Sequence, residues 1–165
     1  PVKPAIPGVD RPGVMTARQA LSHPEKVGEK VVVIGGGSVG AETADFLLGH
    51  DKDVTLVEML PEIAADAEKV NRNVLLRALG EKGLKIRVLT RATAVLEGGV
   101  EVEFDGRKET LPADTVVLAT GWEANSGLEI PLKESGVEFH KIGDCRRPRK
   151  ALEAVHEGFE AAMKI

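Results

Sequence analysis

Short apolar runs alternate with segments of helical periodicity through the first half of the chain. Four β-branched residues in a row follow Lys30, which is typical of a parallel strand buried on both faces. The helix predicted near residue 75 has helical spacing at Val70, Val74, Leu75 and Ala78. The expected elements are a strand over Lys30–Ile34, a helix to about Leu48, a strand over Asp53–Glu58, a helix over Val70–Leu79 and a strand over Leu84–Thr90.

The pattern then changes to strands without an intervening helix. Glu97-Gly98-Gly99 and Asp105-Gly106 are hairpin signals that separate three short β-rich runs. The expected strands are Ala92–Leu96, Val100–Phe104 and Lys108–Leu111, followed by a buried strand over Thr115–Ala119. The element order predicts a three-layer, Rossmann-like α/β fold with a parallel sheet and a β-meander crossover.

The two ends of the chain have weaker patterns. Residues 1–28 are punctuated by Pro and Gly and are predicted to be an extended connector with one short helical patch over Thr16–Leu21. Val137–Ile142 is predicted to be a strand, and a helix is expected to begin near Pro148. The apolar stripe of that helix is Leu152, Val155, Phe159 and Ala162, and the side chains expected to face water are Glu153, Glu157, Glu160 and Lys164.

Composition excludes several classes of partner. A net charge of −4, one Trp and no Tyr argue against nucleic-acid binding. No apolar run approaches the roughly 20 residues that span a bilayer, so we expect no membrane partner. The single Cys145 excludes an internal disulfide and fits a reducing compartment, so a cytoplasmic location is expected. The chain opens on Pro1, within a loop, which indicates a piece of a longer protein.

A glycine-rich turn follows the first buried strand. Its G-x-G-x-x-G spacing permits a tight turn, a close approach of backbone N–H groups to phosphates, and close packing of helix on strand. The helix that starts near Ser38 directs free N–H groups and its positive dipole end at the same point. The expected cofactor contacts are Gly35, Gly37, Ser38, Val39 and Gly40. An ordinary glycine-rich turn is the alternative, but the strand before, the helix after and an acidic residue further on favour a dinucleotide.

That acidic residue is Glu58, which ends the second strand at about the expected distance from Gly40. A carboxylate there can bind both adenosine-ribose hydroxyls and would repel a 2′-phosphate. Met59 and Leu60 follow it, with no Arg or Lys, so NADH is preferred over NADPH. The alternative is a solvated acid at a strand end. Glu42 is expected in the first turn of the helix, either as a carboxylate favoured by the dipole or as a neighbour of the nicotinamide.

Three segments resemble one family of flavoproteins. Val31 to Ala44 resembles the NAD(P)H domain of proteins with two dinucleotide-binding domains, and Val116 to Gly121 resembles the signature that closes such a domain. Ile142 to Phe159 is similar to the C-terminal flavin-site segment of the NADH:flavin oxidoreductase/NADH oxidase family. That family includes 2,4-dienoyl-CoA reductases, enoate reductases and trimethylamine dehydrogenase. The resemblance implies an FAD/NAD(P)-binding fold, with an NAD(H) domain over 29–122 and parts of a truncated FAD domain over 1–28 and 123–165.

The resemblance also implies further site residues. Thr120 and Gly121 would line the cofactor cleft. Gly143 and Asp144 would contact FAD, or FMN, and Asp144 would form a hydrogen bond with the ribityl chain. The alternative for Asp144 is a helix cap or turn former. The first glycine loop for FAD, a flavin-bearing barrel and an iron–sulfur cysteine cluster are all absent from this chain, so they would belong to missing sequence and the flavin site is incomplete here.

We therefore expect an NAD(H)-binding module of a flavin-dependent oxidoreductase that passes hydride from NADH to a flavin. The cofactors carry the chemistry, and no side chain is expected to be catalytic or to bind a metal. The isolated chain should show little or no turnover. Two alternatives stay open: a structural module that binds ADP or AMP without hydride transfer, and the NAD domain of a related disulfide or ferredoxin reductase.

Overall fold

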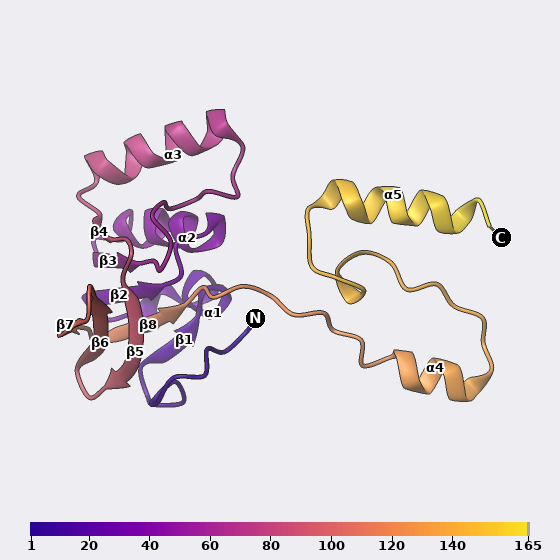
Figure 1. Ribbon diagram of the computed structural model, residues 1–165, viewed down its shortest axis with the longest axis horizontal. Helices are drawn as coiled ribbons and strands as arrows, with labels where there is room; N and C mark the ends of the chain where they lie inside the picture. The colour runs from indigo at the N-terminus through magenta and orange to yellow at the C-terminus, as the bar shows by residue number, and fades with distance from the viewer. Residues whose placement is uncertain (165) are drawn as a thin grey trace. The chain divides into compact units, whose positions relative to one another are not determined.

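The computed structural model describes residues 1–164 and divides into two compact units. The first unit is Pro1–Gly121, and the second begins at Trp122. Figure 1 shows the elements of each unit. Within the described residues, no helix has both the length and the apolar character needed to cross a membrane.

The centre of the first unit is a five-stranded parallel sheet in the order β1-β8-β2-β3-β4. Its strands are β1 (Val14–Thr16), β8 (Thr115–Leu118), β2 (Lys30–Ile34), β3 (Asp53–Val57) and β4 (Lys85–Arg87). The run of β-branched residues that predicted β2 is buried from Val31 to Ile34, as a central parallel strand requires. The strand expected over Leu84–Thr90 is shorter than predicted, because Leu89 has a φ of 52° and cannot continue an extended strand.

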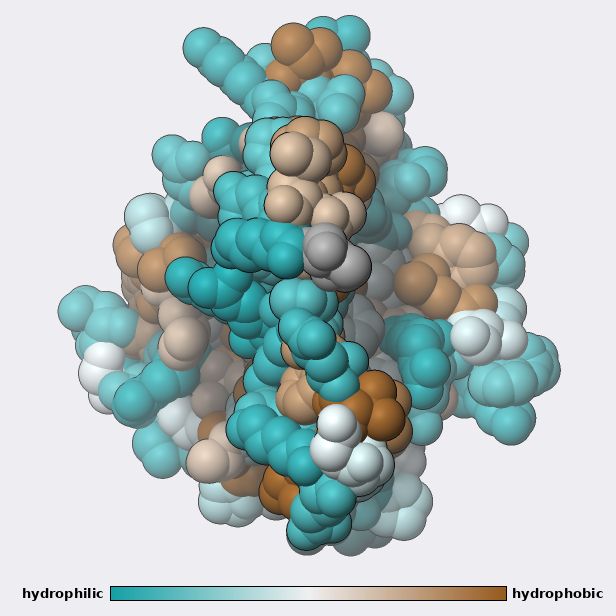
Figure 2. Space-filling model, turned by 90° about the vertical axis from the view of Figure 1, so that its right-hand side faces the viewer, coloured by the Kyte–Doolittle hydropathy of each residue, from teal (hydrophilic) through white to brown (hydrophobic). Residues whose placement is uncertain are grey.

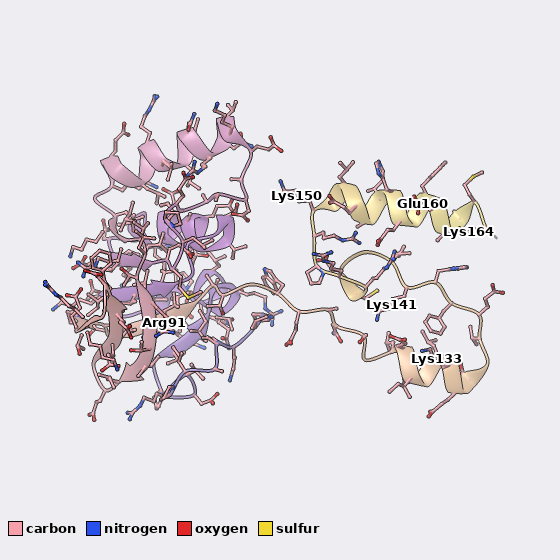
Figure 3. All side chains as sticks on the ribbon, viewed as in Figure 1. Arg91, Lys133, Lys141, Lys150, Glu160 and Lys164 are labelled. Carbon is pink, nitrogen blue, oxygen red and sulfur yellow. The ribbon has the colours of Figure 1, made fainter. Side chains whose placement is uncertain are left out.

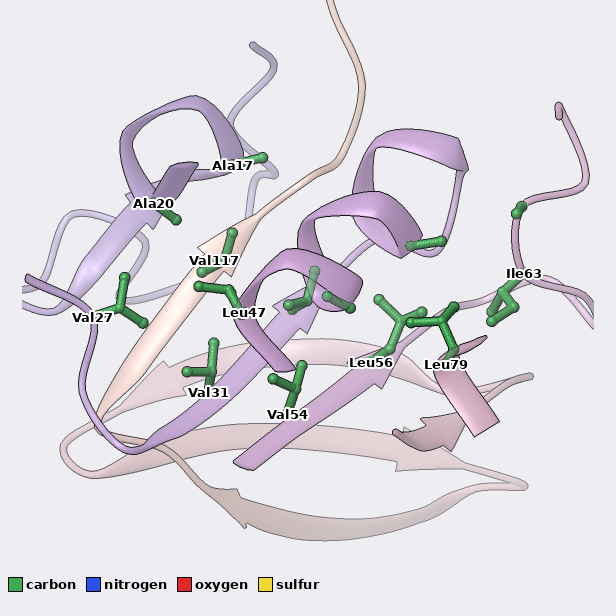
Figure 4. Packing of buried hydrophobic residues seen from close by; sticks show 14 residues of the cluster. Ala17, Ala20, Val27, Val31, Leu47, Val54, Leu56, Ile63, Leu79 and Val117 are labelled. Carbon is green, nitrogen blue, oxygen red and sulfur yellow. The ribbon is translucent and has the colours of Figure 1, made fainter. Parts of the chain in front are cut away.

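Helices cover one face of this sheet, and a three-stranded meander covers the other. The helices are α1 (Ala17–Ser22), α2 (Ser38–Leu48) and α3 (Lys69–Glu81), and the meander consists of β5 (Arg91–Leu96), β6 (Gly99–Phe104) and β7 (Arg107–Pro112). Val31 and Val33 pack in the cluster on the helix side, whereas Val32 and Ile34 pack in the cluster on the meander side. Val31 is labelled in Figure 4. This alternation confirms the predicted three-layer α/β fold.

Helix α3 lies less deeply in the core than its periodicity suggested. Leu79 is fully buried, but Val70 and Val74 are 74% and 66% exposed. The prediction that Val70 and Val74 belong to the packed face of the helix is therefore wrong. The buried end of α3 is the one that leads into β4, where the chain must return to the sheet.

The N-terminal segment contributes more than a connector. Val14–Thr16 forms β1, which pairs with β8 at the edge of the parallel sheet. The predicted helical patch is confirmed as α1, which opens with a capping box between Thr16 and Gln19. A short 3₁₀ helix, Pro24–Lys26, precedes β2. Residues 1–28 thus complete the same unit as residues 29–121, while their assignment to a flavin domain of a longer protein stays a prediction.

The second unit contains helix α4 (Glu129–Ser135), a 3₁₀ turn η2 (Gly143–Cys145) and helix α5 (Ala151–Ala162). The strand expected over Val137–Ile142 is wrong: none of residues 122–164 form a strand. An apolar run becomes a strand only if a neighbouring strand accepts its backbone hydrogen bonds, and the described part of this unit supplies none.

Helix α5 turns a different face to its unit than the one predicted. The expected stripe is open, with Phe159 67% exposed. The half-buried side is formed by Glu153, Ala154, Glu157, Gly158 and Ala161, and the side chain of Glu157 is only 11% exposed. The expectation that Glu157 faces water is therefore wrong. Figure 2 shows apolar side chains, in brown, open to solvent among polar ones.

Candidate functional site

The glycine turn lies at the carboxyl ends of β2, β3 and β8. The Gly35 N–H donates to the carbonyl of Val57 at 2.9 Å, which joins the turn to the end of β3. Gly35 has a φ of +104°, and a β-carbon there would lie 2.4 Å from the carbonyl oxygen of Ala119, just beyond β8. Only glycine fits this position without a shift. The carboxyl ends of parallel strands are where open α/β sheets bind ligands.

Gly36 and Gly40 are required for packing rather than for ligand access. A β-carbon on Gly36 would lie 2.8 Å from Cβ of Glu58 and 2.9 Å from Cγ2 of Ile63. One on Gly40 would lie 1.8 Å from the Gly35 carbonyl oxygen, so α2 can approach the turn only because this residue lacks a side chain. The third glycine of the motif therefore has the packing role that its spacing predicted.

Gly37 differs from its neighbours. A β-carbon placed on Gly37 would not meet the backbone of another segment. The three atoms nearest to that β-carbon all belong to the carboxyl group of Asp66, and the closest is 3.6 Å away. Gly37 is the N-cap of α2 and no side chain caps the helix from that position. The N–H of Ser38, the first residue of α2, donates to Oδ1 of Asp66 at 2.8 Å. The face of the turn over Gly37 and the start of α2 is thus bordered by the Asp66 side chain.

Glu58 points at the glycine turn. Its Oε2 accepts the N–H of Gly36 at 2.6 Å, and its Oε1 accepts the N–H of Leu60 at 2.8 Å. Each carboxylate oxygen keeps a second acceptor site, because a carboxylate has about four. The backbone of Glu58 is held as well, since its N–H donates to Arg87 and its carbonyl accepts from Thr90. A half-buried carboxylate is therefore fixed beside the turn with acceptor capacity left over.

Two exposed apolar side chains beside Glu58 were not anticipated as site residues. Leu60 is 60% exposed and Leu89 is 55% exposed, and the Leu89 N–H donates to the Leu60 carbonyl at 3.2 Å. Met59, an expected site residue, is similarly exposed. The sequence signal for this apolar group was the pair Met59-Leu60 directly after Glu58. Leu89 lies with that pair only because β3 and β4 are neighbouring strands whose ends lie side by side.

Thr120 and Gly121 lie next to the glycine turn at the end of β8. A β-carbon at Gly35 would lie 3.3 Å from the backbone nitrogen of Thr120. The Thr120 hydroxyl donates to the carbonyl of Val2 at 2.8 Å, and the Val2 N–H donates to the carbonyl of Gly121 at 2.9 Å. The N-terminal segment therefore holds this corner of the site in place.

Glu42 is not where it was expected. Helix α2 begins at Ser38 and has no acidic residue in its first turn, so Glu42 lies one turn further along, on the exposed side. The prediction of a first-turn carboxylate is wrong because Glu42 is the fifth residue of a helix that begins at Ser38, beyond its first turn. Val39, by contrast, lies in the first turn, and its carbonyl accepts the hydroxyl of Thr43 at 2.6 Å.

Gly143 and Asp144 belong to the second unit. Gly143 has a φ of +61°, and its N–H donates to Oε2 of Glu157 at 2.7 Å. Asp144 is exposed, and its Oδ1 accepts the backbone N–H of Arg149 at 3.3 Å, which is a turn-forming contact. Arg149 pairs with Glu157 at 2.5 Å and, together with the Gly143 N–H, holds the pKa of the Glu157 carboxyl below its ordinary value.

Comparisons with known proteins identify the family of the chain. The family model described as pyridine nucleotide-disulphide oxidoreductase matches residues 1–148. A bilirubin reductase of Mediterraneibacter gnavus is 40% identical over 98% of this chain and 25% of its own length. An NADH oxidase of Thermoanaerobacter brockii is 34% identical over 100% of this chain and 26% of its own.

A structure of a 2-naphthoyl-CoA reductase complexed with 2-naphthoyl-CoA matches with a TM-score of 0.91 and 31% identity, over 100% of this chain and 25% of that one. The chain thus spans about a quarter of the length of these relatives. The expected class, an oxidoreductase, and the expected cofactors, NAD(H) and FAD, are confirmed at the level of the family. With its NADH:flavin oxidoreductase-like relatives and a family model that covers nearly its whole length, the chain belongs to the pyridine nucleotide-disulphide oxidoreductase family.

Proposed function

We propose that the first unit binds NADH on the glycine turn and presents its nicotinamide for hydride transfer to a flavin held by the whole protein. The observation that carries this proposal is the position of Glu58, whose carboxylate lies against the turn at Gly36 while the start of α2 opens on the same turn. A diphosphate and the neighbouring ribose need these two features together.

The residues present fit the diphosphate. Gly37 has no backbone atom against its open face, so the chain can approach phosphate oxygens closely there. The Ser38 N–H already donates to a carboxylate, which shows that the start of α2 accepts an anion. Gly37 itself places no side chain over the start of α2. In this proposal Gly35, Val39 and Gly40 form the rest of the turn that surrounds the diphosphate.

The surroundings of Glu58 favour NADH over NADPH. Its two oxygens are fixed by the Gly36 and Leu60 amides and keep acceptor sites for the ribose hydroxyls. A 2′-phosphate would meet this carboxylate, which is a like-charge contact. The cation beside it along the sheet, Arg87, is paired with Glu109. The exposed apolar side chains of Met59, Leu60 and Leu89 offer a surface for the adenine.

The nicotinamide half would lie toward the end of β8, where Thr120 and Gly121 adjoin the turn. NADH supplies the hydride, and the side chains of this chain orient it rather than react with it. Gly143 and Asp144 would hold part of the flavin in the whole protein, and the missing FAD-domain half and an N-terminal flavin-bearing barrel are its proposed partners.

Calorimetric titration tests this proposal directly. NADH, NADPH and ADP are each titrated into the protein at fixed ionic strength. We expect NADH to bind more tightly than both NADPH and ADP. Equal affinity for NADH and ADP would mean that the nicotinamide end is not recognised and would favour a structural ADP or AMP module. Absence of NADH binding at millimolar concentration would refute the proposal.

A further inference from the structure

One acidic side chain lies in the space that the proposed diphosphate needs. Asp66 stands between β3 and α3, and its Oδ1 accepts the N–H of Ser38, the first residue of α2, at 2.8 Å. The same carboxyl group supplies the three nearest atoms to the open face of Gly37. The bare glycine and the helix N–H that should receive a phosphate oxygen are therefore both covered by one carboxylate of the chain itself.

We propose that Asp66 is an internal competitor for the diphosphate position, and that its carboxylate must leave the Ser38 amide before NADH can bind. This inference rests on the proposed function, because it concerns the same turn. A carboxylate and a phosphate oxygen make the same kind of charge-assisted hydrogen bond to a helix N–H, so they cannot use this donor together. Two anions side by side over Gly37 would also repel each other.

The surrounding contacts indicate that only the Asp66 side chain has to move. The backbone before it is fixed, because the Ala64 N–H donates to the Gly36 carbonyl at 2.6 Å and Nε of Arg72 donates to the Ile63 carbonyl at 3.0 Å. Ile63 is buried against Gly36. Asp66 itself is exposed, so its side chain can rotate into water without opening the core. The competitor is therefore a side-chain switch on a rigid loop.

This arrangement sets the affinity of the site. In the free protein Asp66 satisfies an N–H of α2 that would otherwise lack a partner within the chain. On binding, a phosphate oxygen accepts the Ser38 N–H, but the hydrogen bond from that N–H to Asp66 must first be broken. The net affinity for any diphosphate is then lower than the turn alone would provide, and a ligand without phosphates is unaffected.

The variant Asp66→Asn removes the charge and keeps the shape. Wild type and variant are titrated with NADH, with ADP and with adenosine. We expect NADH and ADP to bind about fivefold more tightly to D66N. A change of this size corresponds to weakening, but not removing, the charge-assisted hydrogen bond from the Ser38 N–H to residue 66. Adenosine, which has no diphosphate, should bind equally to both proteins. Asp66→Ala serves as a second variant should D66N unfold.

The matched control is Glu62→Gln, on the same loop. Glu62 pairs with Arg72 at 2.8 Å, and the side-chain amide of Gln can keep that contact. If E62Q tightens NADH binding as much as D66N, the effect is a general loss of charge and the competitor role is overturned. Unchanged or weaker NADH binding by D66N also overturns it, while leaving NADH binding itself intact. Failure of every variant and the wild type to bind NADH would overturn the proposed function, and this inference with it.

Backbone NMR supplies a readout that a mere loss of charge would not move. The amide resonance of Ser38 should shift in D66A without ligand, because its hydrogen-bond acceptor is removed. In wild type, added ADP should shift the same resonance as one acceptor replaces another. A Ser38 amide that does not respond to ADP, while ADP binds, would show that the carboxylate stays in place and would overturn the proposal.

Discussion

Gly40 lies directly over the carbonyl of Gly35, so that a β-carbon on Gly40 would be 1.8 Å from that oxygen. The contact joins the first turn of α2 to the residue that directly follows β2. The distance is far shorter than any tolerated contact, and a backbone carbonyl cannot rotate away as a side chain could. The start of α2 is thus positioned by the absence of a single methyl group.

The substitution Gly40→Ala should therefore displace α2 from the turn. We expect a loss of about 2–3 kcal/mol in the free energy of unfolding, as for overpacking of a tight core, together with a large loss of NADH affinity. Urea unfolding followed by circular dichroism gives the first quantity and calorimetry the second. A G40A protein as stable as wild type would show that the helix can shift at no cost.

Gly80 provides the matched control on another helix. It lies near the end of α3, and a β-carbon there would meet nothing within 4 Å. Because alanine has the higher helix propensity and no clash arises, Gly80→Ala should stabilise the protein by about 0.5–1 kcal/mol. The same urea experiment measures it. A destabilised G80A would mean that helical glycines are sensitive here for reasons other than crowding.

The sequence predicted the sheet and the turn because their signals are local. A β-branched run, three spaced glycines and an acid at the next strand end are all visible along the chain, and the structure brings Glu58 to Gly36. Contacts that depend on how a loop folds back were not visible. Nothing in the sequence around Asp66 indicates that its side chain would accept a hydrogen bond from Ser38, 28 positions earlier.

The errors have a common physical cause. Periodicity reports that a segment has an apolar face, but not whether a partner covers it. Val137–Ile142 has the composition of a strand without a neighbouring strand, and Val74 has the spacing of a core residue on the open half of α3. Helix α5 packs through Ala154 and Gly158, whose small size gave no apolar signal. Tertiary packing decided each of these cases.

The role of Glu58 predicts a change in cofactor preference. Glu58→Ala removes the carboxylate that accepts the Gly36 and Leu60 amides. We expect NADH affinity to fall about tenfold, the equivalent of one charged hydrogen bond, and NADPH affinity to fall less because the like-charge contact is also lost. The NADH-to-NADPH ratio from calorimetry is the measurement. Glu97→Ala, in the turn between β5 and β6, is the control and should leave the ratio unchanged.

Truncation of a side chain should cost much more stability in the second half of α3 than in the first. Leu79 is fully buried in the helix-side cluster, whereas Val74 is 66% exposed (Leu79 is labelled in Figure 4). Leu79→Ala should cost about 2–5 kcal/mol because it removes buried methyl groups and leaves a cavity. Val74→Ala should change stability by no more than about 0.5 kcal/mol. Equal losses in urea unfolding would mean that Val74 is covered in solution.

Helix α4 predicts a dependence on pH in the second unit. Glu129 accepts hydrogen bonds from Lys133 at 2.7 Å and Lys141 at 2.8 Å, and the labels in Figure 3 mark both lysines. Lys133 foremost, and then Lys141, lower the pKa of the Glu129 carboxyl from 4.5 to about 2. A carboxyl whose pKa is lower in the folded state stabilises that state fully above its unfolded pKa. This contribution is lost as the pH falls from about 4.5 toward 2.

We therefore expect the helical signal of the second unit to become more sensitive to urea as the pH falls through this window. Glu129→Gln should be less stable than wild type at pH 7, and the difference should narrow as the pH falls below about 4.5 and be largely lost near pH 2, where the folded wild-type carboxyl is half protonated. Glu134→Gln, an exposed position on the same helix, should show no such convergence. A direct check is the titration of the Glu129 side-chain carbon by NMR. A midpoint near 4.5 would show that the two lysines do not hold the carboxylate in solution.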